Sequence, residues 1–218
     1  MRLVILLLLA ALPLQAQDWS ASFGSGPFVF GHFAERTVVI GNETDRTTIT
    51  SRLSAATRAG ATADIERDLN RWLALRLDAS WTRAPLSIKS SSGTSTVSFD
   101  AGRVSVTTFV LPLVVHLNRG AFRIHVLAGP AYALYKIQRR TSQGATVPLF
   151  AGTRGRWGGS AGIGAAWWWS RQFALEWQAA AIVTSSPFHV EDIAASSKGV
   201  RILRPRNGHT TIGLRYHF

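Results

Sequence analysis

The chain has 218 residues, with 24 Lys and Arg against 12 Asp and Glu, which gives a formal net charge of +12. Only 17% of the residues are charged, whereas about 25% is usual in soluble domains. Cys is absent, which disfavours a small secreted domain that is stabilised by disulfides. The length suits a single domain, and the sequence shows no internal repeat that would indicate a second one.

The first residues have the pattern of a signal peptide for export. An apolar stretch follows Arg2 and ends at Leu14, and Ala16 offers a small residue for cleavage. An uncleaved anchor is the alternative, but the stretch is shorter than the roughly 20 residues that span a bilayer. We therefore assign residues 1–16 to a signal peptide and residues 17–218 to the mature domain. Export also makes nucleic acid an unexpected partner for the positive charge.

Beyond the signal peptide no apolar run is long enough for a transmembrane helix, but apolar and polar residues alternate repeatedly. In the middle of the chain, Leu75 and Leu77 alternate with Arg76 and Asp78. A period of two is typical of a strand with one apolar and one polar face. Segments of this kind predict eight strands, at residues 19–33, 51–69, 73–83, 103–117, 121–137, 156–169, 173–184 and 209–218.

The last strand carries a recognisable terminal pattern. Apolar side chains occupy alternate positions up to the final residue, where a soluble domain usually ends in a loose polar tail. The pattern Thr211-x-Gly213-x-x-Tyr216-x-Phe218 resembles the C-terminal sorting signal of bacterial outer-membrane β-barrels. The resemblance implies a location in the bacterial outer membrane. It also implies that the barrel-assembly machinery reads Thr211, Gly213, Tyr216 and Phe218.

The connections between the expected strands alternate between long and very short. Short periplasmic turns and long outer loops are typical of outer-membrane barrels, and an even number of strands places both termini in the periplasm. The whole mature chain therefore resembles the small eight-stranded barrels of the OmpA/OmpX type. This predicts an all-β fold, a single antiparallel up-and-down transmembrane β-barrel. The expected long loops are 34–50, 84–102, 138–155 and 185–208, and the expected turns are 70–71, 118–120 and 170–172.

The aromatic residues indicate which face of the barrel points outward. A soluble lipocalin-like barrel would turn its apolar face inward, whereas a membrane barrel turns that face to lipid. Trp72 and Phe173 lie beside the short turns, while Trp81 and Trp157 lie at the opposite strand ends. Two such girdles are favoured at the two membrane interfaces. We therefore expect an apolar lipid face and a polar lumen.

The polar faces of the strands carry many charges, which would all meet in this lumen. An eight-stranded barrel is only wide enough to be filled by side chains, and buried charges are tolerated when they are paired. We expect a closed interior with a ladder of salt bridges; a proton or ion path is the alternative. The expected network consists of Asp64, Glu66, Arg76, Asp78, Arg123, His125, Glu176 and Arg215, with His217 on the same face.

Residues with catalytic chemistry are present but are not grouped. The histidines lie on separate elements, and although His125 could meet Glu176, no nucleophile is placed beside them. No cluster has metal-ligand spacing, and no glycine loop that could cradle a phosphate opens a helix. We expect a protein that is not an enzyme and that has no cofactor. A lipid-modifying outer-membrane enzyme and a small-solute channel remain the alternatives.

The expected outer loops are rich in basic residues. Such side chains can dock on the phosphates of lipopolysaccharide or on an acidic partner, and we favour the lipid phosphates because the residues flank the outer strand ends. The sequence therefore predicts a monomer in contact with outer-membrane lipid and lipopolysaccharide, with a structural or surface-interaction role in adhesion or envelope integrity. The expected basic residues are Lys136, Arg139, Arg140, Arg154, Arg156, Lys198, Arg201, Arg204 and Arg206.

Overall fold

The computed structural model describes residues 19–40, 46–118, 120–139, 150–192 and 199–218, and most of them lie in β-strands. The predicted signal peptide lies outside the described residues. Within them, no helix is long and apolar enough to cross a membrane. The strands are β1 (Trp19–Val29), β2 (His32–Ile40), β3 (Thr47–Ala55), β4 (Arg58–Asp68), β5 (Leu73–Ser92), β6 (Ser95–Val110), β7 (Leu113–His116), β8 (Phe122–Arg139), β9 (Gly152–Trp168), β10 (Phe173–Thr184), β11 (Val200–Ile202) and β12 (Arg206–His217).

The strands close into an antiparallel ring. On one side, β1 pairs with β4, and β4 pairs with β5. β5 pairs with both β6 and β7, and each of these pairs with β8. The ring continues from β8 to β9, from β9 to β10 and from β10 to β12. Pairing of β12 with β1 completes the ring. β6 and β7 follow one another between β5 and β8 and are separated only by Leu111 and Pro112. The ring therefore has eight positions, and the predicted eight-stranded antiparallel barrel is confirmed.

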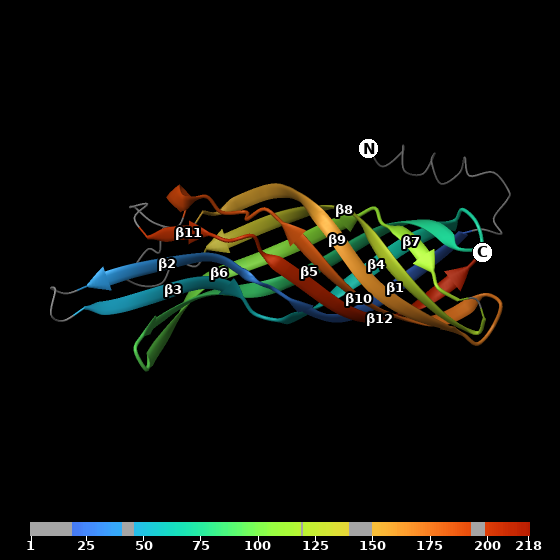
Figure 1. Cartoon of the computed structure of the whole chain (residues 1–218), viewed down its shortest axis with the longest axis horizontal. Helices are drawn as coiled ribbons and strands as arrows, with labels where there is room; N and C mark the ends of the chain where they lie inside the picture. Colours follow the sequence, from blue (N-terminus) through green and yellow to red (C-terminus); the bar gives the residue numbers. More distant parts are fainter. Residues whose placement is uncertain (1–18, 41–45, 119, 140–149, 193–198) are drawn as a thin grey trace.

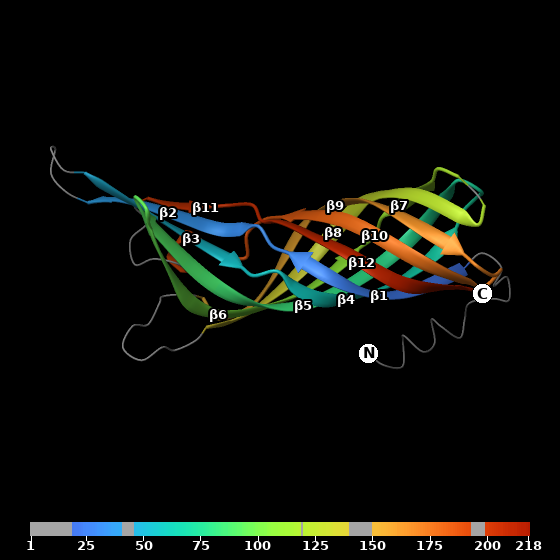
Figure 2. The ribbon, with the colours of Figure 1, turned by 90° about the horizontal axis from the view of Figure 1, so that it is seen from below.

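The barrel is long, and its two ends differ (Figures 1 and 2). At one end lie short turns and the C-terminus. At the other end β2, β3, β11 and the outer parts of β5 and β6 extend past the ring, with β11 paired to β2 and β2 paired to β3. We call these the turn end and the outer end. The strand segments that lie outside the ring are therefore gathered at the outer end.

Part of this outer region was expected to be loop and is strand instead. The predicted loop at 84–102 is wrong, because β5 continues to Ser92 and pairs with β6 from Ser95 onward. The two strands are joined at Gly93, whose φ of 55° falls in the left-handed region that glycine tolerates. The Ser- and Thr-rich composition indicated a loop, although Leu86 and Ile88 on β5 and Val97 and Phe99 on β6 alternate with polar residues. Residues 34–40 likewise belong to β2 rather than to a loop.

The outer surface of the ring is apolar, and its interior face is partly polar. Leu75 and Leu77 on β5 are 43% and 49% exposed, whereas Arg76 between them is 1% exposed. Large exposed side chains continue round the ring, including Phe23, Ile163 and Leu214. So wide an exposed apolar surface would be unfavourable in water, and it is what a lipid-facing barrel needs. The expected polarity is thus confirmed, and the lipocalin-like alternative is wrong.

Candidate functional site

The lumen at the turn end contains a cluster of charged side chains that come from opposite walls. Because successive strand residues point to opposite faces, every second residue of β4, β5, β10 and β12 points inward here. Asp64 and Glu66 come from β4, Arg76 from β5, Glu176 from β10 and Arg215 from β12. These five residues form the set that we call the charge cluster, and the register of the ring brings all of them to one level.

Arg215 is the most extensively bonded member of the charge cluster. It is 3% exposed, and its Nε and Nη2 donate to Glu176 at 2.7 and 3.1 Å. Its Nη2 also lies 2.7 Å from Asp64 Oδ1, and its Nη1 donates to Ser20 Oγ at 2.7 Å. The guanidinium therefore links β12 to β10, β4 and β1. Such charge-assisted and forked bonds are stronger and more specific than neutral ones.

Arg76 makes the second bridge, and it is 1% exposed. Its Nε donates to Glu66 Oε2 at 2.6 Å, and its Nη1 donates to Gln178 Oε1 at 2.7 Å and lies 3.2 Å from Glu176 Oε1. Both arginines thus share Glu176, and the two guanidinium groups cross the lumen between β5, β4, β10 and β12. Gln178 was not expected in this network, although its inward position follows from the period of β10.

Three further expected members lie at the edge of the charge cluster. Asp78 comes only within 4.0 Å of Arg76, and its Oδ1 is buried without a hydrogen bond. His125 Nε2 lies 3.6 Å from Glu176 Oε1. Arg123 places its guanidinium 4.6 Å from the centre of the Trp168 ring, a cation–π contact near the turn end. The Trp168 ring also meets His217, at 6.0 Å between ring centres.

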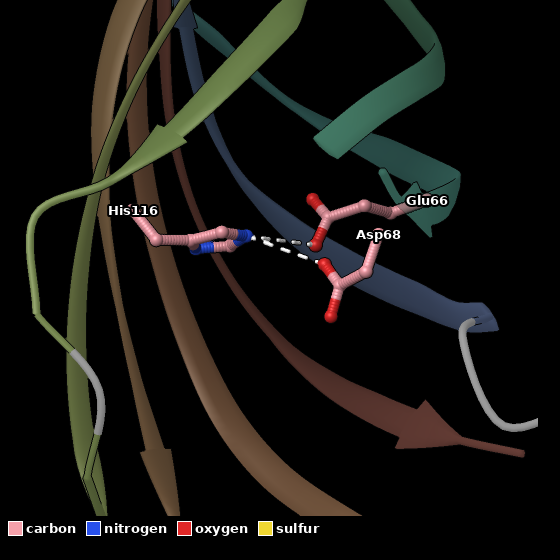
Figure 3. A group of neighbouring side chains, drawn as sticks. All are labelled: Glu66, Asp68 and His116. Carbon is pink, nitrogen blue, oxygen red and sulfur yellow. Dashed lines mark ion pairs between the residues drawn. The ribbon is translucent and has the colours of Figure 1, made fainter. Parts of the chain in front are cut away.

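A histidine that the sequence did not single out faces two carboxylates at the mouth of the lumen. His116 Nε2 on β7 lies 3.7 Å from Glu66 Oε1 and 3.5 Å from Asp68 Oδ1, and Figure 3 shows the ring pointing at both. Among the described residues this is the group whose ligand atoms could surround a metal ion, all within 4.8 Å of one another. Glu66 is, however, already held by Arg76, and Arg215 Nη1 lies 3.6 Å from Glu66 Oε1. These ion pairs account for the arrangement of the three side chains.

The lumen around the charge cluster is nearly full. One cavity of about 20 Å³ lies on its outer side, against Asp78, Ser80 and Thr108. Another of about 20 Å³ lies on its turn side, against His116 and Arg123. Each has room for about one water molecule. Ser22 Oγ donates to Asp64 in this region, but that carboxylate is also paired with Arg215. His125 likewise faces Glu176, which is already paired with Arg215.

The outer half of the interior is apolar, which the sequence analysis did not predict. Phe33 on β2 packs edge-on against Tyr135 and Phe188, at 6.2 and 5.6 Å between ring centres. This outer apolar core also contains Leu53, Ala84, Leu86, Val104, Val106, Ala133 and Ile137, and its members are at most 8% exposed. At its border Tyr135 hydrogen-bonds Thr184 at 2.8 Å and accepts from Asn207 at 3.0 Å.

Two basic residues of the expected outer-loop set lie on a strand and form ion pairs or hydrogen bonds. Arg154 and Arg156 belong to β9; the placement of Arg154 in the loop 138–155 is therefore wrong, whereas Arg156 was expected at the first residue of the strand 156–169. Arg154 Nη1 and Nη2 donate to Asp192 Oδ2 and Oδ1, the second bond being 3.0 Å, and Arg156 Nε donates to Ser186 O at 2.7 Å. Both residues therefore tie the segment between β10 and β11 onto the barrel and do not present free loop charge.

The contact with Arg154 also affects the pKa of Asp192, which lies in the segment between β10 and β11. Partial burial acts to raise the pKa of Asp192, but the hydrogen bonds from Arg154 and from the His189 backbone N–H, together with the Arg154 charge, outweigh it. The pKa of Asp192 is consequently held below its usual range. The carboxylate thus stays ionised and paired at neutral pH.

The other basic residues of the expected set are spread round the outer end. Lys136 and Arg139 are exposed among the last four residues of β8, and Arg201 is exposed on β11. Arg204 and Arg206 are exposed where the chain enters β12. The structure does not gather these five into one site. Arg140 and Lys198 lie outside the described residues.

The four residues of the expected sorting signal lie where β12 meets β1. Thr211 is buried toward the lumen, and a side chain at Gly213 would come within 2.4 Å of Phe23 O. Tyr216 and Phe218 meet edge-on on the outside, at 5.1 Å between ring centres, and Phe218 N donates to Trp19 O at 3.0 Å. The final residue is thus part of the seam that closes the barrel. Its recognition by assembly machinery stays a prediction.

An apolar outer wall, a filled lumen and a one-sided extension define a small transmembrane β-barrel of the outer-membrane type. The fold is similar to that of outer membrane protein OprG from Pseudomonas aeruginosa, at 10% identity and a TM-score of 0.60 over 93% of this chain and 96% of that one. Outer membrane protein AlkL, studied in lipid bilayers, gives 15% and 0.53 over 93% and 90%. Neisserial surface protein A gives 9% and 0.50 over 92% and 97%.

These similarities confirm the resemblance that the sequence indicated. The chain has the fold of the small outer-membrane β-barrels, and the likeness agrees with the expected location in the bacterial outer membrane. No protein-family model and no curated protein matches the sequence. At 9–15% identity the shared property is the fold, so the role of this chain must be argued from its own side chains.

Proposed function

We propose that this protein is a closed outer-membrane β-barrel without enzymatic activity, whose role is structural or lies in contacts made at the cell surface. One observation carries the proposal: the lumen is blocked twice, by side chains of different chemistry at two levels. The charge cluster fills it at the turn end, and the outer apolar core fills it at the outer end.

The charge cluster supports an ionic block. Arg76 and Arg215 lie between Asp64, Glu66 and Glu176, and every one of these five side chains is at most 8% exposed. A solute could pass only if these pairs separated. Separating buried charges leaves each without a partner in a medium of low dielectric constant, which costs several kcal/mol per broken pair. The alternative of a small-solute channel therefore requires a rearrangement of the strongest contacts in the lumen.

The outer apolar core supports a second, independent block. Phe33, Leu86 and Phe188 are 0–1% exposed and come from β2, β5 and the segment before β11. Ions would have to cross this region without polar partners, which is unfavourable. Since the two blocks have opposite chemistry, a change that opens one leaves the other in place.

The outer end supports a role at the surface. The hairpins β2–β3 and β5–β6 extend past the ring (Figure 2) and carry many polar side chains. Basic side chains there are suited to lipopolysaccharide phosphates, and we propose this lipid as the main partner of a monomeric barrel. We also propose that the barrel-assembly machinery recognises the terminal strand. Adhesion and envelope integrity are the roles that such contacts would serve.

Conductance in planar lipid bilayers tests the proposal. We expect the purified barrel to give at most small and infrequent currents. A variant with Arg76→Ser and Glu66→Ser lacks two charged side chains of the charge cluster. It should remain closed because the outer apolar core is unchanged. A porin of known conductance, inserted under the same conditions, serves as the control for detection. A steady porin-sized current from the native protein would refute the closed barrel.

The enzymatic alternative is tested separately. The folded protein is incubated with lipid A, and the lipid is then analysed by mass spectrometry. We expect no change in acyl chains or phosphates over the time in which a lipid A deacylase of known activity completes the reaction. A new lipid species that heat-unfolded protein does not produce would contradict the proposal.

A further inference from the structure

The outer wall of the barrel has a basic hollow that the sequence analysis did not recognise. Its volume is about 350 Å³, and its lining includes Arg83, Arg103 and Arg139 together with Asp100 and Gln138. We call it the arginine hollow. All five side chains are exposed, and three cations face a single carboxylate. The hollow therefore carries net positive charge.

The register of three neighbouring strands builds the hollow. Arg83 on β5 lies opposite Ser105 on β6, and Ser105 lies opposite Lys136 on β8. One step toward the outer end, Arg103 on β6 lies opposite Gln138 on β8. Neighbouring strands are about 4.8 Å apart, and alternate residues are about 6.7 Å apart along a strand. The basic side chains consequently share one patch small enough for several of them to reach one anion.

The side chains of the hollow are partly positioned in advance. Arg83 Nη2 donates to Gln138 Oε1 at 3.0 Å, so the Arg83 side chain extends across β6 toward β8. Asp100 Oδ1 accepts from Gly102 N at 2.9 Å, which holds that carboxylate near its own backbone. Guanidinium groups bind phosphate through paired N–H donors and are more weakly hydrated than ammonium groups. A tetrahedral oxyanion therefore matches the donors that the hollow presents.

The hollow lies at the height of the barrel where lipid headgroups are found. Trp81, which is 52% exposed, precedes Arg83 by two residues on the same outward face of β5. On the neighbouring wall the rings of Tyr132 and Trp157 are in tilted contact, at 4.8 Å between ring centres, and Trp157 is 71% exposed. Exposed aromatic side chains mark the membrane interface in barrels of this type. The arginine hollow begins just beyond this girdle, on the side of the outer end.

We propose that the arginine hollow binds a phosphate group on the headgroup of a lipid in the outer leaflet. The inference rests on the outer-membrane location and surface role proposed above, and it names the site and the ligand chemistry. Arg83, Arg103 and Arg139 hold the phosphate oxygens, Lys136 adds positive charge at the rim, and the acyl chains of the lipid lie along the apolar wall below Trp81. The lipid is thereby fixed against β5, β6 and β8.

Binding of lipid A to the folded barrel in detergent micelles tests the proposal, with native mass spectrometry as the measurement. The probes are lipid A that carries both phosphates and lipid A from which the phosphates have been removed. We expect the native protein to retain the phosphorylated form preferentially. The variant R83Q/R103Q/R139Q should bind it at least about tenfold more weakly, which corresponds to about 1.4 kcal/mol. Heat-dependent migration on a gel verifies that each variant is folded.

A second triple variant separates the hollow from general positive charge. R201Q/R204Q/R206Q removes three exposed arginines of the outer end that do not line the hollow. It should change the affinity by less than twofold. Equal losses in the two triple variants would overturn the proposal, and so would equal retention of the two forms of lipid A. Full displacement by an equimolar amount of inorganic phosphate would also overturn it, since the site would then take free phosphate.

The conductance measurement keeps this inference distinct from the proposed function. A barrel that stays closed while R83Q/R103Q/R139Q retains lipid A like the native protein would contradict the arginine hollow alone. A barrel that conducts steadily, yet loses lipid A in this variant and not in the control, would contradict the closed-barrel proposal and leave the phosphate site supported.

Discussion

Replacing Arg215 by Met is expected to destabilise the barrel strongly, because this side chain connects more walls of the lumen than any other member of the charge cluster. Arg215 bonds Ser20, Asp64 and Glu176, each at 2.7 Å, and is 3% exposed. Methionine is a shorter, unbranched side chain without the charge. The substitution leaves Asp64, Glu66 and Glu176 with Arg76 as their only cation of the cluster.

The size of the effect follows from the burial of these carboxylates. Removing one partner of a buried ion pair costs about 3–5 kcal/mol, because the remaining charge is left uncompensated. We expect Arg215→Met to lose about that much free energy of unfolding in lipid vesicles. Urea titration followed by tryptophan fluorescence measures this quantity. Arg171→Met, in an exposed turn, serves as the control and should stay within about 0.5 kcal/mol of the native protein.

A double variant tests the physical cause. Glu176→Gln removes one of the carboxylates that Arg215 neutralises, so adding it to Arg215→Met should restore about 1 kcal/mol or more, within the range of coupling seen between contacting residues. If the two changes were additive, or if Arg215→Met unfolded at the same urea concentration as the native protein, the argument that the charge cluster stabilises the lumen would be refuted.

Three further substitutions examine the wall, the terminus and the outer segment. Leu77 lies on the lipid face, midway between Trp72 and Trp81, and Leu77→Arg should cost about 2–4 kcal/mol of stability in lipid. Leu69→Arg, beside the short turn, is the control and should cost about 0–1 kcal/mol. Equal costs in urea titrations would contradict a membrane-embedded wall. Deleting Phe218 should lower the amount of barrel recovered from the outer-membrane fraction more than it lowers the stability of the refolded protein, and normal recovery in immunoblots would argue against the sorting signal. The Arg154–Asp192 ion pair should be fully formed above the usual aspartate pKa of 3.8 and be lost as the pH falls through the lowered pKa of Asp192. Digestion of the native protein by an acid-tolerant protease should therefore increase at low pH. The variant Asp192→Asn lacks the ion pair and should be cleaved readily at every pH.

The sequence by itself determined the barrel, because its information is local and periodic. The alternation of Leu75 and Leu77 with Arg76 and Asp78 assigns one face to lipid and one to the lumen whatever the neighbouring strand is. The tight turns fix where strands reverse, and their alternation with longer connections fixes the up-and-down order. The inward direction of Asp64, Glu66, Glu176 and Arg215 follows from the same period, so the charges of the lumen could be found without the structure.

Only the tertiary structure decided which of these charges meet and what fills the rest of the barrel. Pairing depends on the stagger between strands. This stagger brings Arg215 on β12 to Glu176 on the adjacent β10 and to Asp64 on β4, beyond β1, while Arg123 turns to Trp168. The strand character of 87–92 and 95–100 depends on the backbone ladder between β5 and β6. The Ser- and Thr-rich sequence marks these strands only by two short alternations, at Leu86 and Ile88 and at Val97 and Phe99. The outer apolar core and the arginine hollow each join residues from several strands. Sequence periodicity gives the face on which a side chain lies, but only the closed sheet determines its neighbours.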